Sequence, residues 1–170
     1  MNLKVTEVEH YTDRLFRIRT ERPAAFRFTA GEFTMIGITD DNIKRAYSMT
    51  SGPHDDYLEF YSIKVPGGPL TSRLQHINVG DEIEVGTKTT GTLTLANLEL
   101  GGDLWMLATG TGIAPFISLL RDPETYDHFD QIHVYWSVRT SAELQAYDSF
   151  LQEQGVKYTA TVTQDPTWKG

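Results

Sequence analysis

The chain has 170 residues, a hydrophobic fraction of 39% and a formal net charge of −8 at pH 7, and it can form one large domain or two small ones. It contains no cysteine, which excludes disulfides, thiolate–metal sites, cysteine-ligated iron–sulfur clusters and a cysteine nucleophile. The negative charge argues against nucleic acid or an anionic membrane as a partner.

No apolar run is long enough to cross a bilayer, and the first residues lack the basic and then apolar pattern of a signal peptide. We therefore expect a cytoplasmic protein. The five histidines show no spacing typical of paired metal ligands, so no metal site is expected.

From the N-terminus to about Leu95, short segments rich in β-branched and aromatic residues alternate with breakers that contain glycine or proline. These segments predict antiparallel strands at 15–19, 33–38, 57–65 and 82–85. Many strands at this spacing indicate a closed barrel or a sandwich. One helix, at 70–77, is expected to interrupt them.

After Gly101 and Gly102 the pattern changes to strands that alternate with helices, which is typical of a parallel sheet with right-handed crossovers. The expected elements are strands at 104–108, 132–138 and 156–162 and helices at 113–121 and 141–154. Ser141 is the expected N-cap of the last helix, and Gly155 its C′ residue. We therefore predict two domains, 1–100 and 101–170, joined near residues 97–103.

A cation, an aromatic ring and a hydroxyl lie close together in Arg45-Ala46-Tyr47-Ser48. A guanidinium suits a diphosphate because it donates several charge-assisted hydrogen bonds, and a tyrosine ring can stack on a flavin. Strand alternation places Arg45 and Tyr47 on one face and Ser48 on the other, unless the strand bends or ends there. Taken alone, the segment is better explained as an edge strand in which the arginine stem covers the tyrosine.

Two glycine-containing segments are candidate anion sites. The first, 67–72, combines Gly67 and Gly68 with two hydroxyls, although a turn with an N-capping hydroxyl needs no ligand. The second, Gly110-Thr111-Gly112, separates a buried strand from a helix and is typical of a diphosphate loop. Pro115 stands where the dinucleotide fingerprint has its third glycine, so a helix start without a ligand is an equal alternative for this segment alone.

Basic residues are concentrated in the first fifty positions, namely Arg14, Arg17, Arg19, Arg22, Arg27, Lys44 and Arg45. Composition favours solvated strand faces as the explanation. The alternative is a basic docking surface for an acidic partner protein, which would speed their encounter at low salt.

In combination, these segments resemble the ferredoxin (flavodoxin)–NADP reductases of the bacterial type, within the ferredoxin reductase superfamily. Residues 45–48 are similar to the flavin signature of that family, and residues 110–116 to its nucleotide-diphosphate loop. Residues 60–76 and 137–144 also follow the bacterial pattern, and the similarity runs from near residue 3 to Gly170. The resemblance implies an FAD-binding antiparallel β-barrel followed by a truncated, Rossmann-like α/β domain with a parallel sheet.

The resemblance also implies roles for individual residues. Tyr47 would stack on the isoalloxazine and Ser48 would hydrogen-bond near flavin N5, so both are expected to serve catalysis. Arg45 would bind the FAD diphosphate. Further contacts with FAD are implied for Ile63, Lys64, Val65, Gly68, Leu70, Thr71 and Ser72. Contacts with the nicotinamide nucleotide are implied for Gly110, Thr111, Gly112 and, at the adenosine 2′-phosphate, Arg139.

The implied function is an oxidoreductase that transfers a hydride between NADP(H) and FAD and exchanges single electrons with an acidic carrier, ferredoxin or flavodoxin. Two alternatives stay open: a reductase for another acceptor, and an FAD-binding module or electron-transfer subunit without NAD(P)H turnover of its own. Gln164 stands where similar reductases often have a second phosphate-binding arginine, so NAD(H) is not excluded. Because the family continues past Gly170, we expect a truncated product, a fragment or a chain completed by another polypeptide, with an exposed apolar face or sheet edge.

Overall fold

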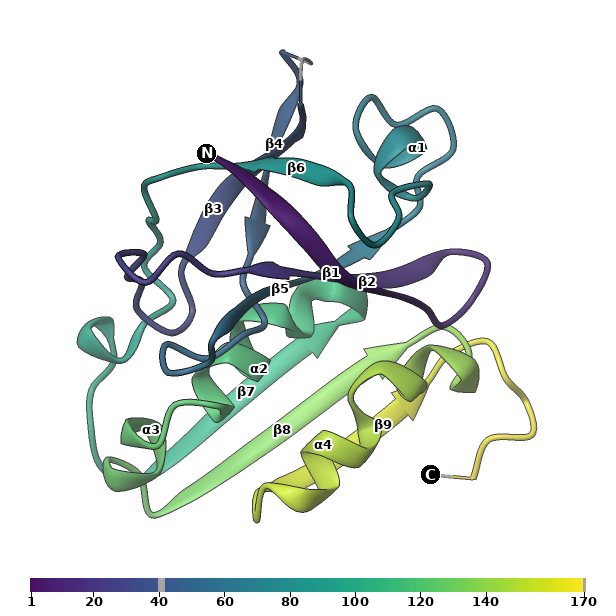
Figure 1. Cartoon of the computed structure of the whole chain (residues 1–170). Helices are drawn as coiled ribbons and strands as arrows, with labels where there is room; N and C mark the ends of the chain where they lie inside the picture. The colour runs from purple at the N-terminus through teal and green to yellow at the C-terminus, as the bar shows by residue number, and fades with distance from the viewer. Residues whose placement is uncertain (40–41, 170) are drawn as a thin grey trace.

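The computed structural model describes residues 1–39 and 42–169, which form two β-sheets of different kinds (Figure 1). The strands of the first sheet are β1 (Asn2–His10), β2 (Leu15–Glu21), β3 (Phe33–Ile38), β4 (Lys44–Ser48), β5 (Tyr57–Ile63) and β6 (Glu82–Val85). The second sheet consists of β7 (Asp103–Thr109), β8 (Gln131–Val138) and β9 (Lys157–Val162). The helices are α1 (Thr71–Leu74), α2 (Ala114–Leu120), α3 (Glu124–Asp127) and α4 (Asp148–Glu153), with 3₁₀ turns at Leu95–Asn97, Gly110–Ile113 and Ser141–Ala146.

The first sheet is antiparallel, in the order β4-β3-β6-β1-β2-β5, and its two ends meet. Met49 directly follows β4 and forms an antiparallel bridge with Phe60 of β5, so the sheet closes into a barrel. The barrel is filled by alternate, inward-facing apolar side chains of its strands. Leu70, just before α1, and Leu74, within α1, are also buried in this core.

The second sheet is parallel, in the order β7-β8-β9. The face that carries Met106, Val134 and Trp136 is covered by α2 and α4, which contribute Ile117 and Leu151 to the same core. This arrangement is expected for strand–helix–strand units, because each crossover helix buries its apolar side on the sheet. The predicted antiparallel barrel followed by a parallel α/β sheet is therefore confirmed.

The opposite face of the parallel sheet exposes apolar side chains. Trp105, Leu107 and Tyr135 are 55%, 68% and 38% exposed, and Trp105 stacks on His133 with ring centroids 4.0 Å apart. We expected the parallel sheet to expose either an apolar face or an edge, and the apolar face is exposed. Within the described part of the chain, none of the helices combines the length and the apolar character that a bilayer span requires.

Helix α2 lies between the barrel and the parallel strands (Figure 1). Ser118 is buried in this contact, and its hydroxyl donates to the carbonyl of Ser51 at 2.7 Å. Gly52 allows the close approach, because a Cβ at this position would lie 2.8 Å from Cβ of Arg121. The two sheets therefore share a packed interface. The expected domain boundary between residues 100 and 101 stays a prediction.

The helices differ from the predictions more than the strands do. The helix expected at 70–77 is reduced to α1, and the one expected at 113–121 begins as the 3₁₀ turn Gly110–Ile113. The helix expected at 141–154 is divided at Tyr147, which has φ −138° and ψ 1°. Its N-cap is Thr140 rather than Ser141, because Thr140 forms a capping box with Glu143.

Candidate functional site

A cleft of about 400 Å³ lies where the barrel meets the start of α2, and we call it the β4 cleft. It is lined by Arg45, Ala46, Tyr47, Ser48, Tyr61, Ser62, Ile63, Thr111, Gly112, Ala114 and Pro115. The two segments singled out in the sequence, 45–48 and 110–112, are therefore brought together. Strand β4 of the barrel and the loop after β7 of the parallel sheet both line this cleft.

Tyr47 is held in a defined orientation in this cleft. Its hydroxyl lies 2.9 Å from the Ser62 hydroxyl of the neighbouring strand β5. Burial raises the pKa of Tyr47, and the hydrogen bond with Ser62 offsets only part of that effect. The phenol therefore stays neutral at physiological pH, and its fixed ring can serve as a stacking surface.

Arg45 and Ser48 line the same cleft as Tyr47. The prediction from alternation allowed for a strand that ends at Ser48, and β4 does end there. Arg45 is exposed, and its Nη1 donates to the carbonyl of Lys44 at 2.9 Å, which leaves other N–H groups of the guanidinium available. A cation, a ring and a hydroxyl thus face one space.

The loop from Gly110 to Gly112 presents bare backbone. A Cβ added to Gly110 or Gly112 would meet no atom within 4 Å, and Gly110 has φ +51°, which favours glycine. The carbonyl of Gly110 accepts a 2.8 Å hydrogen bond from Nε1 of the fully buried Trp136. Pro115 lies in the first turn of α2, where its missing N–H leaves no hydrogen bond unmade. The loop is therefore held in place by Trp136, and its backbone is open to a ligand.

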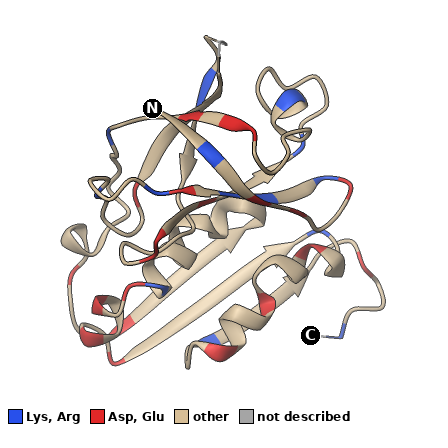
Figure 2. Ribbon diagram, viewed as in Figure 1, with Lys and Arg blue, Asp and Glu red and all other residues tan. Residues whose placement is uncertain are grey.

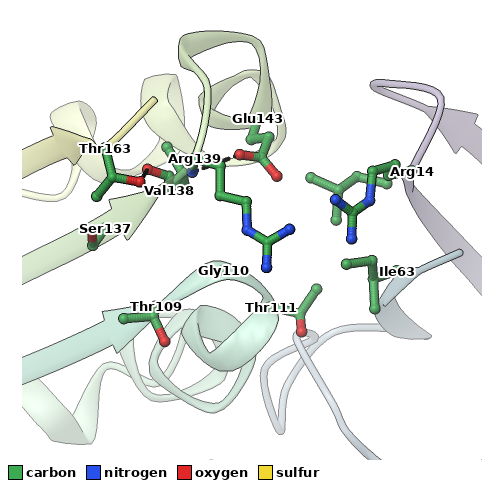
Figure 3. Close-up of a pocket in the computed structure, with 11 residues that line it drawn as sticks. Arg14, Ile63, Thr109, Gly110, Thr111, Ser137, Val138, Arg139, Glu143 and Thr163 are labelled. Atoms are coloured by element: carbon green, nitrogen blue, oxygen red, sulfur yellow. Dashed lines mark hydrogen bonds between the residues drawn. The ribbon is translucent and has the colours of Figure 1, made fainter. Parts of the chain in front are cut away.

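A second cavity of about 390 Å³, the Arg139 cavity, adjoins the β4 cleft (Figure 3). It is lined by Arg14, Leu15, Ile63, Thr109, Gly110, Thr111, Ser137, Val138, Arg139, Glu143 and Thr163. Ile63 and Thr111 line both spaces, so the two are adjacent. Arg139 extends over Gly110 and Thr111 in Figure 3, whereas Glu143 accepts the backbone N–H of Arg139 at 2.7 Å.

Comparison with known proteins agrees with this geometry. Residues 2–93 match the family model "Oxidoreductase FAD-binding domain" and residues 106–170 match "Oxidoreductase NAD-binding domain". The crystal structure of a ferredoxin NADP⁺ reductase from Neisseria gonorrhoeae with bound FAD and NADP is similar over 100% of this chain and 71% of that one. It is 33% identical, with a TM-score of 0.92. The chain belongs to the ferredoxin–NADP reductase family.

Curated relatives are more similar in sequence. The flavodoxin/ferredoxin–NADP reductase of Rhodobacter capsulatus is 57% identical over 144 residues, which are 83% of this chain and 53% of that protein. The ferredoxin–NADP reductase of Azotobacter vinelandii is 48% identical over 152 residues, which are 88% of this chain and 58% of that protein. The chain thus spans about half the length of the curated relatives it matches.

Other residues to which the family resemblance gives a role line neither space. They are Lys64, Val65, Gly68, Leu70, Thr71 and Ser72. The Thr71 hydroxyl closes the turn before α1, 3.2 Å from the backbone N of Val65. A Cβ at Gly68 would lie 2.5 Å from that hydroxyl, so this tight turn requires a glycine. Their contacts with FAD stay predictions.

Residues that sequence reasoning did not single out also line the two cavities or hold a lining residue in place. Ser62 orients Tyr47, Trp136 anchors Gly110, and Arg14 faces Arg139 across the second cavity. Tyr61 lines the β4 cleft, and its buried hydroxyl has no hydrogen-bond partner among the described residues. Motif spacing does not find such residues, because they reach the site from other strands and turns.

Three of the seven basic residues named in the first fifty positions form ion pairs within the described part of the chain. Arg17 and Arg19 form ion pairs with Glu7, and Lys44 pairs with Glu84 at 2.5 Å. Figure 2 shows acidic and basic residues interleaved on the barrel strands, with acidic residues predominating around α3. The pairing favours solvated strand faces over a continuous basic surface, and the docking surface stays a prediction.

Proposed function

We propose that this chain holds FAD and a nicotinamide nucleotide in an oxidoreductase that transfers a hydride between NADP(H) and FAD and single electrons to or from ferredoxin or flavodoxin. The observation that carries the proposal is the β4 cleft, in which Tyr47 and Ser48 face Thr111 and Gly112. Two groups that exchange a hydride must approach closely, and a cleft with walls from both halves of the chain permits this approach. The family membership supports the same chemistry.

The residues of the β4 cleft fit FAD. The oriented ring of Tyr47 suits the flavin plane, and the unpartnered Tyr61 hydroxyl can donate to a polar ligand atom. The Ser48 hydroxyl would bond near flavin N5, and the exposed guanidinium of Arg45 would bind the diphosphate. When bound, FAD supplies the conversion between electron pairs and single electrons.

The residues of the Arg139 cavity fit a nicotinamide nucleotide. The open backbone at Gly110 and Gly112 allows a diphosphate to approach without a steric clash. Arg139 extends into the same space and can meet a 2′-phosphate. We infer that residues 1–100 form the FAD-binding domain and 101–170 the nucleotide-binding domain. The locations of the six-stranded and three-stranded sheets support this division.

The partner is proposed from the relatives and from charge. The curated relatives carry the names of ferredoxin and flavodoxin reductases. Arg27 is exposed on the barrel half and lines neither cavity, so the cofactors do not neutralise its charge. Such a cation favours an acidic electron carrier, since complementary charge speeds the encounter of two proteins.

The decisive experiment mixes the purified, FAD-loaded protein with NADPH under anaerobic conditions and follows flavin absorbance. Bleaching, followed by reduction of added ferredoxin or flavodoxin, is the expected result. A protein that keeps FAD but does not bleach at high nucleotide concentration would be an FAD-binding module only. A folded protein that does not bind added FAD would overturn the proposal.

A further inference from the structure

Arg14 and Arg139 come from opposite halves of the chain but line one cavity. Arg14 lies in the turn between β1 and β2 of the barrel, and Arg139 follows β8 of the parallel sheet. Figure 3 shows both guanidinium groups pointing into the space above Gly110 and Thr111. Two cations thus approach one glycine-containing loop from two sides.

The backbone of Arg14 is held in place. Its carbonyl accepts a 2.6 Å hydrogen bond from the N–H of Lys64, and its own N–H donates to the Thr12 hydroxyl at 3.1 Å. Leu15, the next residue, pairs with Ile63 of β5, and Ile63 lines both cavities. The turn therefore projects the Arg14 side chain from a fixed point at the border of the two cavities.

The charges of the Arg139 cavity favour an anion. Among the described residues, neither the Arg14 nor the Arg139 guanidinium has a carboxylate within ion-pair distance. Glu143 is the acidic residue in the lining, and its Oε2 accepts the backbone N–H groups of Arg139 at 2.7 Å and Thr140 at 2.8 Å. Two arginines and one carboxylate, which already accepts two backbone hydrogen bonds, leave an excess of positive charge. Guanidinium groups bind phosphates through paired, charge-assisted hydrogen bonds.

The position of Arg14 indicates which phosphate it meets. Arg139 shares its end of the cavity with Ser137, Val138 and Thr163, whereas Arg14 lies beside Ile63, at the border with the β4 cleft. A dinucleotide whose nicotinamide enters the β4 cleft would place its diphosphate at this border. Its adenosine 2′-phosphate would lie farther along, towards Arg139.

We propose that Arg14, a barrel residue, binds the diphosphate of the nicotinamide nucleotide, so that the bound nucleotide bridges the two halves of the chain. The inference rests on the proposed function. Arg14 and Arg139 would then bind different phosphates of the same nucleotide. Arg14 contributes equally to NADPH and NADH, which share the diphosphate, and Arg139 contributes to NADPH alone.

The test compares Arg14→Ala with wild type, using the FAD-loaded protein and flavin reduction by NADPH and by NADH. The KM of both nucleotides should rise by the same factor, about tenfold, with kcat and FAD content unchanged. Inorganic pyrophosphate should inhibit the variant correspondingly less, and Arg14→Lys should restore part of the affinity. Arg27→Ala is the matched control, because Arg27 is also exposed but lines neither cavity.

The outcomes separate this inference from the proposed function. An Arg14→Ala variant with both KM values within twofold of wild type, or with only the NADPH value raised, would overturn the role of Arg14 alone. A wild-type protein that holds FAD but neither reacts with nor binds either nucleotide would overturn both. Among the described residues, the hydrogen bonds of Arg14 involve its backbone groups, so its replacement should leave the melting temperature unchanged, which thermal unfolding verifies.

Discussion

Glu59→Gln is expected to weaken the contact between the barrel and the parallel sheet. Glu59 lies on β5 and is 0% exposed. Its Oε1 accepts hydrogen bonds from the Thr50 hydroxyl at 2.8 Å, the Tyr147 hydroxyl at 3.0 Å and Nη1 of Arg121 at 3.1 Å. Its Oε2 accepts one from Nε of Arg19 at 2.6 Å. One buried carboxylate therefore joins barrel residues to residues of the α/β part.

The expected size of the effect follows from these contacts. Glutamine keeps the volume of the side chain but removes the charge that faces Arg121, Arg19 and, at 3.6 Å, Arg17. Removing one member of a buried ion pair costs about 3–5 kcal/mol. Arg17 and Arg19 keep Glu7 as a partner, Arg121 keeps Asp55 at 3.7 Å, and the Arg19 side chain is 25% exposed, so the lower end of that range is expected. For a chain of this length the melting temperature should fall by roughly 10 °C.

The pH dependence of this effect has a defined sign. Burial alone would raise the pKa of Glu59, but the charges of Arg121 and Arg17 and a hydrogen bond from Arg19 outweigh burial and hold it below its usual value. A lowered pKa stabilises the fold above the ordinary carboxyl pKa, and this contribution is lost as the pH falls through the lowered value. The stability of wild type should therefore approach that of Glu59→Gln in acid.

Urea unfolding of wild type and Glu59→Gln, followed by tryptophan fluorescence over a series of pH values, measures both effects. The difference in free energy of unfolding should be largest near neutral pH and should shrink in acid. A difference that stays constant with pH, or a neutral-pH loss below about 1 kcal/mol, would refute the electrostatic argument. Thr125→Val is a matched control, since Thr125 is also buried and its hydroxyl donates to the Leu119 carbonyl within the α/β part.

Three further predictions concern the site. Arg45→Ala should lower FAD affinity by about tenfold, since it removes a charged hydrogen bond, whereas Ser48→Ala should keep the flavin and slow its reduction. Flavin absorbance after gel filtration and stopped-flow reduction distinguish them, and equal flavin loss would contradict the two roles. Arg139→Ala should raise the KM of NADPH more than that of NADH in steady-state assays; an equal rise would show that Arg139 does not contact the 2′-phosphate. Trp136→Phe should deprive the Gly110 carbonyl of its 2.8 Å donor, which costs about 1 kcal/mol, and should leave a cavity at this fully buried position, so the total loss of stability should be about 2–3 kcal/mol. It should also weaken nucleotide binding without loss of FAD. An unchanged nucleotide Kd, measured by titration, would show that Trp136 does not position the loop for the nucleotide.

The strands were predictable because their signal is local. The predicted bounds 33–38 and 82–85 coincide with β3 and β6, and the apolar run 104–108 lies within β7. A strand that is buried on one face usually alternates in sequence, whereas β7 is continuously apolar although Trp105 and Leu107 are exposed on one of its faces. Such patterns are complete within a few residues, so no distant contact is needed to recognise them.

The last helix could not be predicted correctly, because a distant contact divides it. Tyr147 is buried, and its hydroxyl reaches Glu59 of the barrel at 3.0 Å. Its backbone leaves the helical conformation at that point. The sequence between Ser141 and Gln154 has a helical pattern and contains no sign of this partner. Tertiary contacts override local propensity in this way.

The candidate site was predictable where its residues are neighbours in sequence. The segments 45–48 and 110–112 could be singled out from residue types, and the family resemblance indicated that they belong together. Arg14 and Ser62 could not be found in this way. A turn residue such as Arg14 follows no periodic pattern, and the partner of Tyr47 depends on which strand lies beside β4.

Helix α2 connects the buried carboxylate to the site. It begins directly after the loop that carries Thr111 and Gly112, and Arg121 follows its last residue. Arg121 is held by Glu59 at 3.1 Å and by the Thr50 carbonyl at 3.1 Å, so the end of the helix is fixed to the barrel. A helix of seven residues is a short, stiff element, and its two ends cannot move independently. The Glu59 contacts, together with the Ser118 hydrogen bond to the Ser51 carbonyl, therefore fix the helix that follows the 110–112 loop to the barrel.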